Sequence, residues 1–293
     1  MSSRITPLTD PAHGANSRRL AWLASDADSI PTGTAFLRLF NSPGQEHLAE
    51  LTLQVHPAER RRHVGSQLLN AAVAAARDNA RRCITAQAEA GAPGDQFLGV
   101  RGFRKVLTLR FSRLPLADVD TTALAEIIEH SHPGYRLAAG QGAVPDDLAH
   151  TFAVSRRAMD DMPMEDTDYG TVTWDVDRVR AAAKAVERRG DHLHTVAAID
   201  TSNGSIAGFT EVVIPGNGTG DAQHYGTGVL PEHRGHGLGR WMKAESIQHA
   251  HGHYPDLGGL LTDTADSNTH MRQINDSLGY TPTHTTHQYQ LGL

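Results

Sequence analysis

The sequence predicts an α/β protein with a mixed (α+β) sheet. The same order of strands and helices occurs twice along the chain. Its 293 residues are enough for one large domain or two of ordinary size, and 39% hydrophobic residues are enough for a core. Short alternating or apolar runs of strand length are interleaved with stretches of helical periodicity. Both halves pass through strands, a helix, another strand and a final strand in the same order. We therefore expect an N-terminal domain over residues 1–118 and a C-terminal domain over residues 119–293.

In the first half, three strands are expected before a helix and two after it. The apolar residues of the helix recur near a 3.6-residue period, at Val64, Leu68, Leu69, Ala72 and Ala76. A turn-rich piece separates the last two strands. The expected strands cover 19–26, 33–40, 48–55, 82–88 and 104–112, and the helix covers 62–80.

The second half repeats this order behind two additional helices. The helices are expected at 145–159 and 175–189, and the second places Val176, Val179, Ala183 and Val186 on one face. The connection between the halves, 114–140, contains a short helix at 121–130. The later elements are strands at 194–200, 205–214 and 222–229, a helix at 236–250, a strand at 258–264, a helix from 268 to 279 and a strand at 284–291. The first half is thus predicted to be a shortened copy that lacks the leading helices.

Charge and apolar runs exclude several classes of protein. The formal net charge is −6, whereas a general nucleic-acid binder needs a basic excess. The longest apolar run, Leu68–Ala76, is far shorter than the roughly 20 residues of a membrane span. The first residues show no basic segment followed by an apolar core, and Cys83 has no second cysteine to pair with. We expect a cytoplasmic protein without membrane or nucleic-acid partners, and whether it forms a homodimer stays open.

The strongest local pattern is a glycine-rich turn between an expected strand and an expected helix. The strand ends at Val229, and the turn from Arg234 to Gly239 leads into the helix. Free backbone N–H groups at a helix N-terminus carry partial positive charge and bind phosphate. Gly235, Gly237 and Gly239 have no Cβ atom to keep a diphosphate away from the backbone. The pattern predicts a phosphate site, although a turn that only packs tightly would look alike.

The spacing R-x-x-G-x-G resembles the acyl-CoA motif of the GCN5-related N-acetyltransferase (GNAT) superfamily. The resemblance continues in a later helix, where Asn268, Met271, Ile274 and 278–280 fit the family's closing pattern. It implies a GNAT fold and transfer of an acetyl group from acetyl-CoA, as co-substrate, without a metal. By this resemblance, the residues that bind acetyl-CoA are Val229, Arg234, Gly235, His236, Gly237, Leu238, Gly239, Asn268 and Asn275.

The first half carries a degraded copy of the same motif. Residues 55–65 align with it, and 97–103 resemble the closing helix. His63 stands at a glycine position, where a Cβ atom and an imidazole would crowd a diphosphate. The arginines at 60–62 are either solvated or in contact with phosphate. The chain thus resembles tandem GNAT proteins, similar in plan to mycothiol synthase, with a degenerate N-terminal domain and one working site in the second half.

Direct acetyl transfer needs an acceptor for the amine proton, a donor for the oxyanion and a proton for the thiolate. The resemblance assigns the oxyanion donor to the backbone N–H of Val229. The family's usual glutamate base falls on Gln223, which cannot act as a base, and its usual tyrosine acid falls on Asn275. The remaining catalytic candidates are Glu211, His224 and Tyr225, together with Asn275 at the acid position.

Each of these candidates also has a structural interpretation. Alternation places Glu211 on one strand face with Phe209 and Val213, where it interrupts an apolar set. A solvated carboxylate at the strand edge explains Glu211 as well as a catalytic base does. His224 and Tyr225 are likewise compatible with purely structural roles.

An acidic stretch lies between the two leading helices, a connection that borders the acceptor pocket in GNAT folds. Its Asp161, Glu165 and Asp166 would attract a cationic amine, although a solvated loop also explains them. The expected acceptor is a primary amine on a small molecule, such as an amino acid, an amino sugar or an antibiotic. The alternatives are a non-catalytic acyl-CoA-binding protein and an acetyltransferase for protein lysines or N-termini.

Eighteen histidines raise the question of a metal site. His249, His251 and His253 come near a helix end, where i,i+4 spacing places two of them on one face. No cysteine or clear carboxylate completes the set, and imidazoles also suit the negative end of a helix dipole. No metal is therefore expected.

Overall fold

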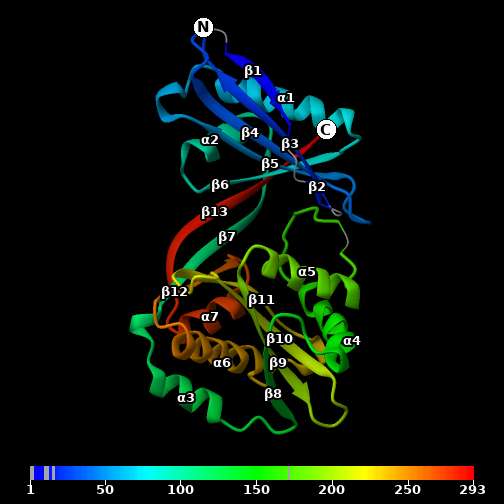
Figure 1. The fold of residues 1–293 in the computed structure, drawn as a ribbon, viewed down its shortest axis with the longest axis vertical. Coiled ribbons are helices and arrows are strands. Elements are labelled where there is room, and N and C mark those ends of the chain that lie inside the picture. Colours follow the sequence, from blue (N-terminus) through cyan, green and yellow to red (C-terminus); the bar gives the residue numbers. More distant parts are fainter. Residues whose placement is uncertain (1–2, 10–12, 15–16, 171) are drawn as a thin grey trace. The chain divides into compact units, whose positions relative to one another are not determined.

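The computed structural model describes residues 3–9, 13–14, 17–170 and 172–293. The chain forms two compact units, each with its own hydrophobic core (Figure 1). The first comprises Met1–Thr108, Glu165–Val172 and Thr285–Leu293, and the second comprises Leu109–Met164 and Thr173–His284. Each compact unit therefore consists of separate stretches of the sequence. The boundary expected near residue 118 stays a prediction for the limits of the two sequence repeats.

The strands of the first unit pair antiparallel, except for one parallel pair. Strands β5 and β6, which α1 connects, are parallel and pair over Leu48–Leu51. The buried residues of α1 are the five that the sequence period predicts, and they pack into the sheet core. The strands, in order across the sheet, are β1 (Arg4–Leu8), β3 (Ser17–Ser25), β4 (Pro31–Phe40), β5 (Leu48–Val55), β6 (Cys83–Glu89) and β13 (Thr281–Gly292), and β2 (His13–Gly14) pairs with β3. The helices are α1 (Val64–Asp78) and α2 (Pro93–Val100).

The last strand of the chain completes the sheet of the first unit. Residues 286–292 of β13 pair antiparallel with β6. Tyr289 lies in the core of this unit, and its hydroxyl donates to Asp95 at 2.6 Å. Strand β7 (Arg104–Pro115) does the reverse, because its residues 109–115 pair with a strand of the second unit. Each half of the sequence thus supplies a strand to the sheet built mainly from the other half.

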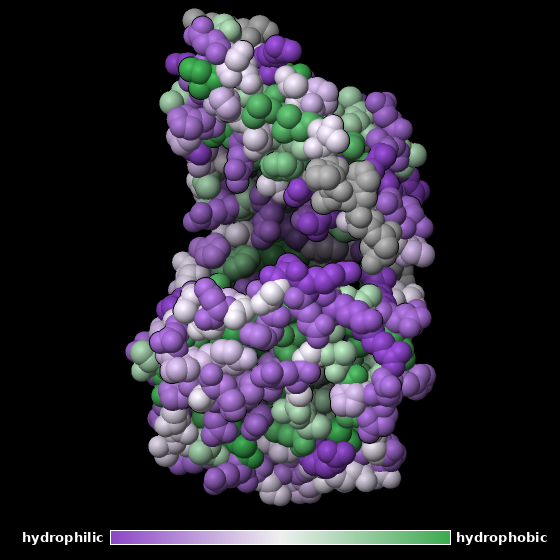
Figure 2. Space-filling view, viewed as in Figure 1, coloured by the Kyte–Doolittle hydropathy of each residue, from purple (hydrophilic) through white to green (hydrophobic). Residues whose placement is uncertain are grey.

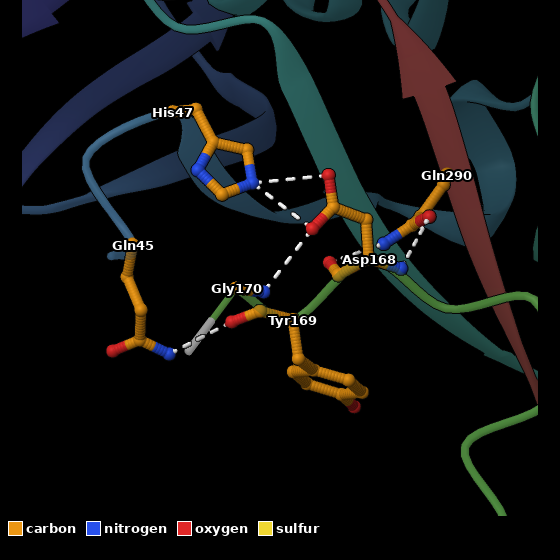
Figure 3. A network of polar contacts seen from close by, with 6 residues as sticks. All are labelled: Gln45, His47, Asp168, Tyr169, Gly170 and Gln290. Atoms are coloured by element: carbon orange, nitrogen blue, oxygen red, sulfur yellow. Dashed lines mark hydrogen bonds and ion pairs between the residues drawn. The ribbon is translucent and has the colours of Figure 1, made fainter. Parts of the chain in front are cut away.

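The segment 165–172, which the sequence places between two helices of the second half, also belongs to the first unit. Figure 3 shows Asp168 of this segment between His47 and Gln290. His47 Nε2 lies 3.0 Å from both carboxylate oxygens of Asp168. The Gln290 side chain accepts a hydrogen bond from the Asp168 backbone N–H at 3.1 Å and donates one to the Asp168 backbone C=O at 2.8 Å. The His47 contact and the Gly170 N–H hold the pKa of Asp168 below its usual range.

The second unit is a sheet with helices on both faces. Helices α4 and α5 cover the face that carries Phe209 and Val213, and α3, α6 and α7 cover the face that carries Val212 and Ile214. In order across the sheet, the strands are β7, β12 (Leu257–Ala265), β11 (Gly220–Val229), β10 (Ile206–Ile214), β9 (His192–Asp200) and β8 (Tyr135–Gln141). The helices are α3 (Thr121–Glu129), α4 (Asp146–Ser155), α5 (Val176–Arg188), α6 (Leu238–His253) and α7 (Thr269–Ser277).

The predicted fold class and the expected helices of both halves are confirmed. β10 is buried along its whole length because helices cover both of its faces. Alternation places Glu211 with Phe209 and Val213, as the sequence predicts. β8 begins in the connection 114–140, where no strand is expected, and ends at Gln141. Over the visible surface of the second unit, hydrophilic residues dominate and hydrophobic ones are scattered among them (Figure 2), as helices that bury one face should show.

Candidate functional site

The glycine-rich turn between β11 and α6 has the backbone shape of an anion cradle. Gly235 and Gly237 have φ of +82° and +73°, in the left-handed region that favours glycine. Gly237 is the N-cap of α6, and no described atom lies within 4 Å of where a Cβ atom of Gly235 would be. The first N–H groups of a helix have no intrahelical acceptor. The turn therefore presents open backbone donors at the positive end of α6.

The other predicted residues of this turn differ in what they contact. Leu238 is buried and begins α6, and Gly239 approaches Ile274 of α7 closely enough that a Cβ atom would lie 3.5 Å from its Cδ1. His236 is exposed and lines a pocket beside the turn. Leu238 and Gly239 thus fix the helix, whereas His236 is accessible to a ligand.

The predicted phosphate-binding arginine is part of an ion pair. Arg234 donates from Nη1 and Nη2 to the carboxylate of Asp161 at 2.6 and 2.8 Å, and from Nε to the Val229 carbonyl at 3.0 Å. The hydrogen bonds raise the pKa of Arg234 and lower the pKa of Asp161. Asp161 therefore lies beside the glycine-rich turn, held by Arg234. Glu165 and Asp166 belong to the first unit, where Asp166 pairs with Arg104.

Strands β11 and β12 diverge beside the turn. They pair in parallel from Gly220 to Gln223, and no described strand pairs with that edge of β11 beyond Gln223. The N–H of Leu230 donates to the Ala207 carbonyl of β10. Because donors alternate along a strand, the N–H of Val229 points to the opposite edge. The fork between β11 and β12 thus exposes the backbone donor that the sequence predicts for the oxyanion.

A β-bulge in β11 lies at the base of this fork. Glu211 of β10 faces Gly226, and the next residue, Val212, faces His224, so Tyr225 is the extra residue. Tyr225 is 52% exposed, and its hydroxyl accepts a hydrogen bond from Arg189 at 2.8 Å. The exposed side chain of Tyr225 is accessible to an acceptor molecule.

Glu211 forms a buried ion pair. Its Oε1 accepts from Arg156 Nη2 at 2.7 Å, and both side chains are over 90% buried. The guanidinium also lies over three aromatic rings, those of Phe152, Trp174 and Phe209, at 4.9, 4.6 and 4.5 Å. Sequence reasoning missed this pairing, because Arg156 is 55 residues away and reads as an ordinary basic residue. One oxygen of the predicted base is therefore already occupied.

His224 lies on the opposite face of the sheet, toward α6. It is buried, and neither ring nitrogen has a hydrogen-bond partner among the described residues. Burial is the main cause that lowers the pKa of His224 well below its usual value, with contributions from Lys243 and His194. Lys243 is a further buried group that sequence reasoning missed, because it follows the exposed Arg240 by three residues and so reads as part of a solvated helix face.

The two asparagines of the closing helix have structural partners. Asn268 is the N-cap of α7, and its side chain accepts from the Met271 N–H at 3.1 Å. Asn275 is buried and donates to Thr264 Oγ1 at 3.2 Å, while its Oδ1 has no partner within the described chain. Asn275 thus lies next to β12 and has one free acceptor.

A pocket of about 720 Å³ adjoins the glycine-rich turn. One wall is α3, and the other contains the turn and Arg240. His132, also in the wall, stacks on Trp241 with ring centroids 4.0 Å apart. Sequence reasoning did not predict this pocket, because its walls come from the interdomain connection and from the turn.

The degraded turn of the first half keeps the same backbone shape. Arg61 and His63 both have φ of 65°, and His63 is the N-cap of α1. They stand where Gly235 and Gly237 stand in the second half. Left-handed conformations cost a non-glycine residue roughly 1–2 kcal/mol. The fold thus imposes this turn even without glycine, and the imidazole of His63 occupies the position that a bare backbone needs.

The described residues contain no group of three or more metal-binding side chains, and His249 and His253 are stacked on each other, with ring centroids 4.1 Å apart. No helix among them is long and apolar enough to cross a membrane. Cys83 is buried and unpaired.

The fold and the turn define a protein of the acyltransferase type. The sequence matches the acetyltransferase (GNAT) family over residues 5–96 and 157–280, so the chain belongs to this family. Because the match occurs in both halves, the chain is a tandem-domain member. A search of curated proteins finds no match.

Solved structures share the fold at low sequence identity. A tandem GNAT protein from the clavulanic acid biosynthesis pathway has a TM-score of 0.77 and 23% identity, covering 96% of this chain and 84% of that one. A GCN5-related N-acetyltransferase from Sphaerobacter thermophilus has a TM-score of 0.66 and 14% identity, covering 93% and 80%. One from Kribbella flavida has a TM-score of 0.55 and 17% identity, covering 89% and 88%.

Proposed function

We propose that the second unit transfers an acetyl group from acetyl-CoA to the primary amine of a small molecule. The observation that carries this proposal is the position of the fork directly beside the anion cradle. The open N–H groups at Gly235 and Gly237 suit a diphosphate, and the open N–H of Val229 suits a developing oxyanion. Both are backbone donors at fixed positions, so they need no rearrangement when charge develops.

The residues present fit acetyl-CoA. Gly235 leaves open space where a side chain would block a diphosphate, and the adjoining pocket offers His236 and Arg240 to further anionic groups. When bound, acetyl-CoA supplies the activated thioester. The chain's own task is to place the carbonyl at the Val229 N–H and to accept the amine proton.

The acceptor side contains Glu211, Tyr225 and Asp161. Asp161 is the predicted substrate-binding acid that belongs to this unit, and Arg234 holds it beside the turn. The two-point pair with Arg234 compensates the charge of Asp161, so Asp161 offers an acceptor for a hydrogen bond from the amine but little net attraction for a cation. The acceptor we propose is a small cytoplasmic amine. A protein lysine stays an alternative, which competition by peptides would reveal.

The test is a panel of amines mixed with acetyl-CoA, with release of the CoA thiol as the readout. Gly237→Glu places a carboxylate in the anion cradle and should abolish acetyl-CoA binding in calorimetry while the fold persists. Gly252→Glu is the matched control, because Gly252 lies on the same helix with no described atom within 4 Å of the added Cβ. Unchanged affinity in Gly237→Glu would remove the cradle from the proposal.

A non-catalytic acyl-CoA-binding protein is the second candidate. It is favoured by the Glu211–Arg156 ion pair and by amides, Gln223 and Asn275, at the family's base and acid positions. Such a protein would bind acetyl-CoA in calorimetry and release no thiol with any amine of the panel.

A further inference from the structure

The pocket beside the glycine-rich turn owes one wall to the connection between the two halves of the sequence. Trp241 of α6 donates from Nε1 to the carbonyl of Ile128 in α3 at 3.0 Å. His132, a few residues after α3, stacks flat on the Trp241 ring, with an interplanar angle of 7°. These residues of the connection lie between the two stretches that match the family. The wall is therefore a feature of this chain that the family's motifs do not supply.

The ring of His132 is held in one orientation. Its Nδ1 lies 2.8 Å from the backbone carbonyl of His130. Because a carbonyl oxygen only accepts, Nδ1 carries the proton of the neutral ring, and Nε2 has a lone pair. The stack on the buried Trp241 fixes the plane of the imidazole. Nε2 is therefore the nitrogen that takes up a second proton when His132 becomes charged.

Nε2 of His132 faces the glycine at the start of α6. A Cβ atom on Gly237 would lie 3.4 Å from this nitrogen. Apart from the turn and the helix itself, no other described residue lies within 4 Å of that position. Gly237 is the N-cap of α6, and the first N–H groups of a helix have no acceptor within it. An oxygen bound beside Gly237 on this open side thus comes within hydrogen-bonding reach of Nε2.

The charges around His132 nearly balance before a ligand binds. The other titratable side chains of the pocket come from α3 and the residues after it, from β8, from the turn and from α6, and they are Glu126, His130, Tyr135, His236 and Arg240. The carboxylate of Glu126 and the guanidinium of Arg240 carry opposite charges, and burial raises the pKa of Tyr135, which stays neutral. A bound diphosphate adds two negative charges, which favour a proton on Nε2. The indole face of Trp241 stabilises the resulting cation.

From this geometry we infer that His132 is a further ligand of the acetyl-CoA diphosphate, which it binds as an imidazolium through Nε2–H. The inference rests on the proposed function, because it takes the anion cradle as the diphosphate site. It adds that binding is linked to protonation, so that the diphosphate and a proton bind together near neutral pH. The neutral ring presents a lone pair to the same oxygen. Acetyl-CoA should thus bind more tightly in weak acid than in weak base.

The test is calorimetry with acetyl-CoA that lacks its 3′-phosphate. A phosphate monoester itself titrates at about pH 6, and removing it leaves a ligand whose diphosphate keeps both charges throughout the experiment. Wild type should bind this ligand roughly tenfold more tightly at pH 5.5 than at pH 8.5. At pH 7 it should also take up part of a proton, which appears as a binding heat that changes with the ionisation enthalpy of the buffer.

Two variants assign the proton to His132. His132→Phe keeps a flat ring that can stack on Trp241, and it removes both nitrogens. Its affinity should be nearly independent of pH and close to that of wild type at pH 8.5. His132→Gln should likewise take up no proton, although its amide can still donate a hydrogen bond. His251→Phe is the matched control, since His251 is exposed in the last turn of α6, and its pH dependence should superimpose on that of wild type.

The outcomes separate this inference from the proposed function. If His132→Phe keeps the pH dependence and proton uptake of wild type, the inference is wrong and the anion cradle stands. If only the ligand with a 3′-phosphate shows pH dependence, the proton belongs to that phosphate, and the inference is wrong as well. If wild type binds neither ligand, both proposals fall. If wild type binds with the expected proton uptake and transfers no acetyl group to any amine, the proposed function is wrong and the role of His132 stands.

Discussion

Lys243→Met should make the protein more stable at neutral pH, and the gain should disappear in alkali. An unfolded lysine binds its proton below about pH 10.5, whereas Lys243 in the folded chain binds it only below about pH 7. Between these values the unfolded state holds more protons, so the free energy of unfolding of wild type rises with pH. Below pH 7 Lys243 is protonated in both the folded and the unfolded state, so the buried charge lowers the free energy of unfolding of wild type by its full amount.

The size of the effect follows from the same pKa difference. A lowering from 10.5 to about 7 spans about 3.5 pH units, and each is worth about 1.4 kcal/mol, which gives an upper bound of roughly 5 kcal/mol. Lys243 is 1% exposed, so solvent screens little of this. Methionine removes the charge without leaving a large cavity.

The assay is urea unfolding of wild type, Lys243→Met and, as a control at an exposed lysine of α5, Lys184→Met between pH 6 and pH 10. The difference in free energy between Lys243→Met and wild type should be several kcal/mol at pH 6–7 and shrink steadily toward pH 10. Groups away from Lys243 titrate alike in all three proteins, so the difference reports Lys243 together with His224 and Asp263, whose pKa values its charge influences. A difference that does not change with pH would refute a nearly neutral amine in the core, independently of any acetyl transfer.

Three further predictions concern other parts of the chain. Tyr289→Ala should destabilise the first unit by roughly 3–5 kcal/mol in denaturant unfolding, because the ring fills its core and the hydroxyl bonds Asp95; no effect on that unit would contradict the pairing of β13 with β6. His63→Gly should raise the unfolding free energy by about 1 kcal/mol, since it relieves a left-handed residue; a loss would show that the imidazole makes a stabilising contact. Glu211→Gln should lower the melting temperature, with a cost of about 3–5 kcal/mol for stranding Arg156 in the core; full stability together with slow turnover would instead support Glu211 as the base.

The local patterns of the sequence determined the order of elements and the anion cradle. The 3.6-residue period of Val64, Leu68 and Ala72 and the glycines at 235 and 237 act through neighbours along the chain. Such signals involve backbone conformation and one helix face, so they can be read without a partner. The same holds for the side of β10 on which Glu211 stands.

Only the tertiary structure decided which distant groups meet. The sequence predicts a strand at 284–291, but it cannot show that residues 286–292 pair with β6 of the first unit. Likewise, nothing local indicates that Glu211 bonds Arg156 or that Lys243 lies against Tyr280. The chemistry of a buried charge depends on desolvation and on the groups packed around it, and both are properties of the folded core that a linear sequence does not contain.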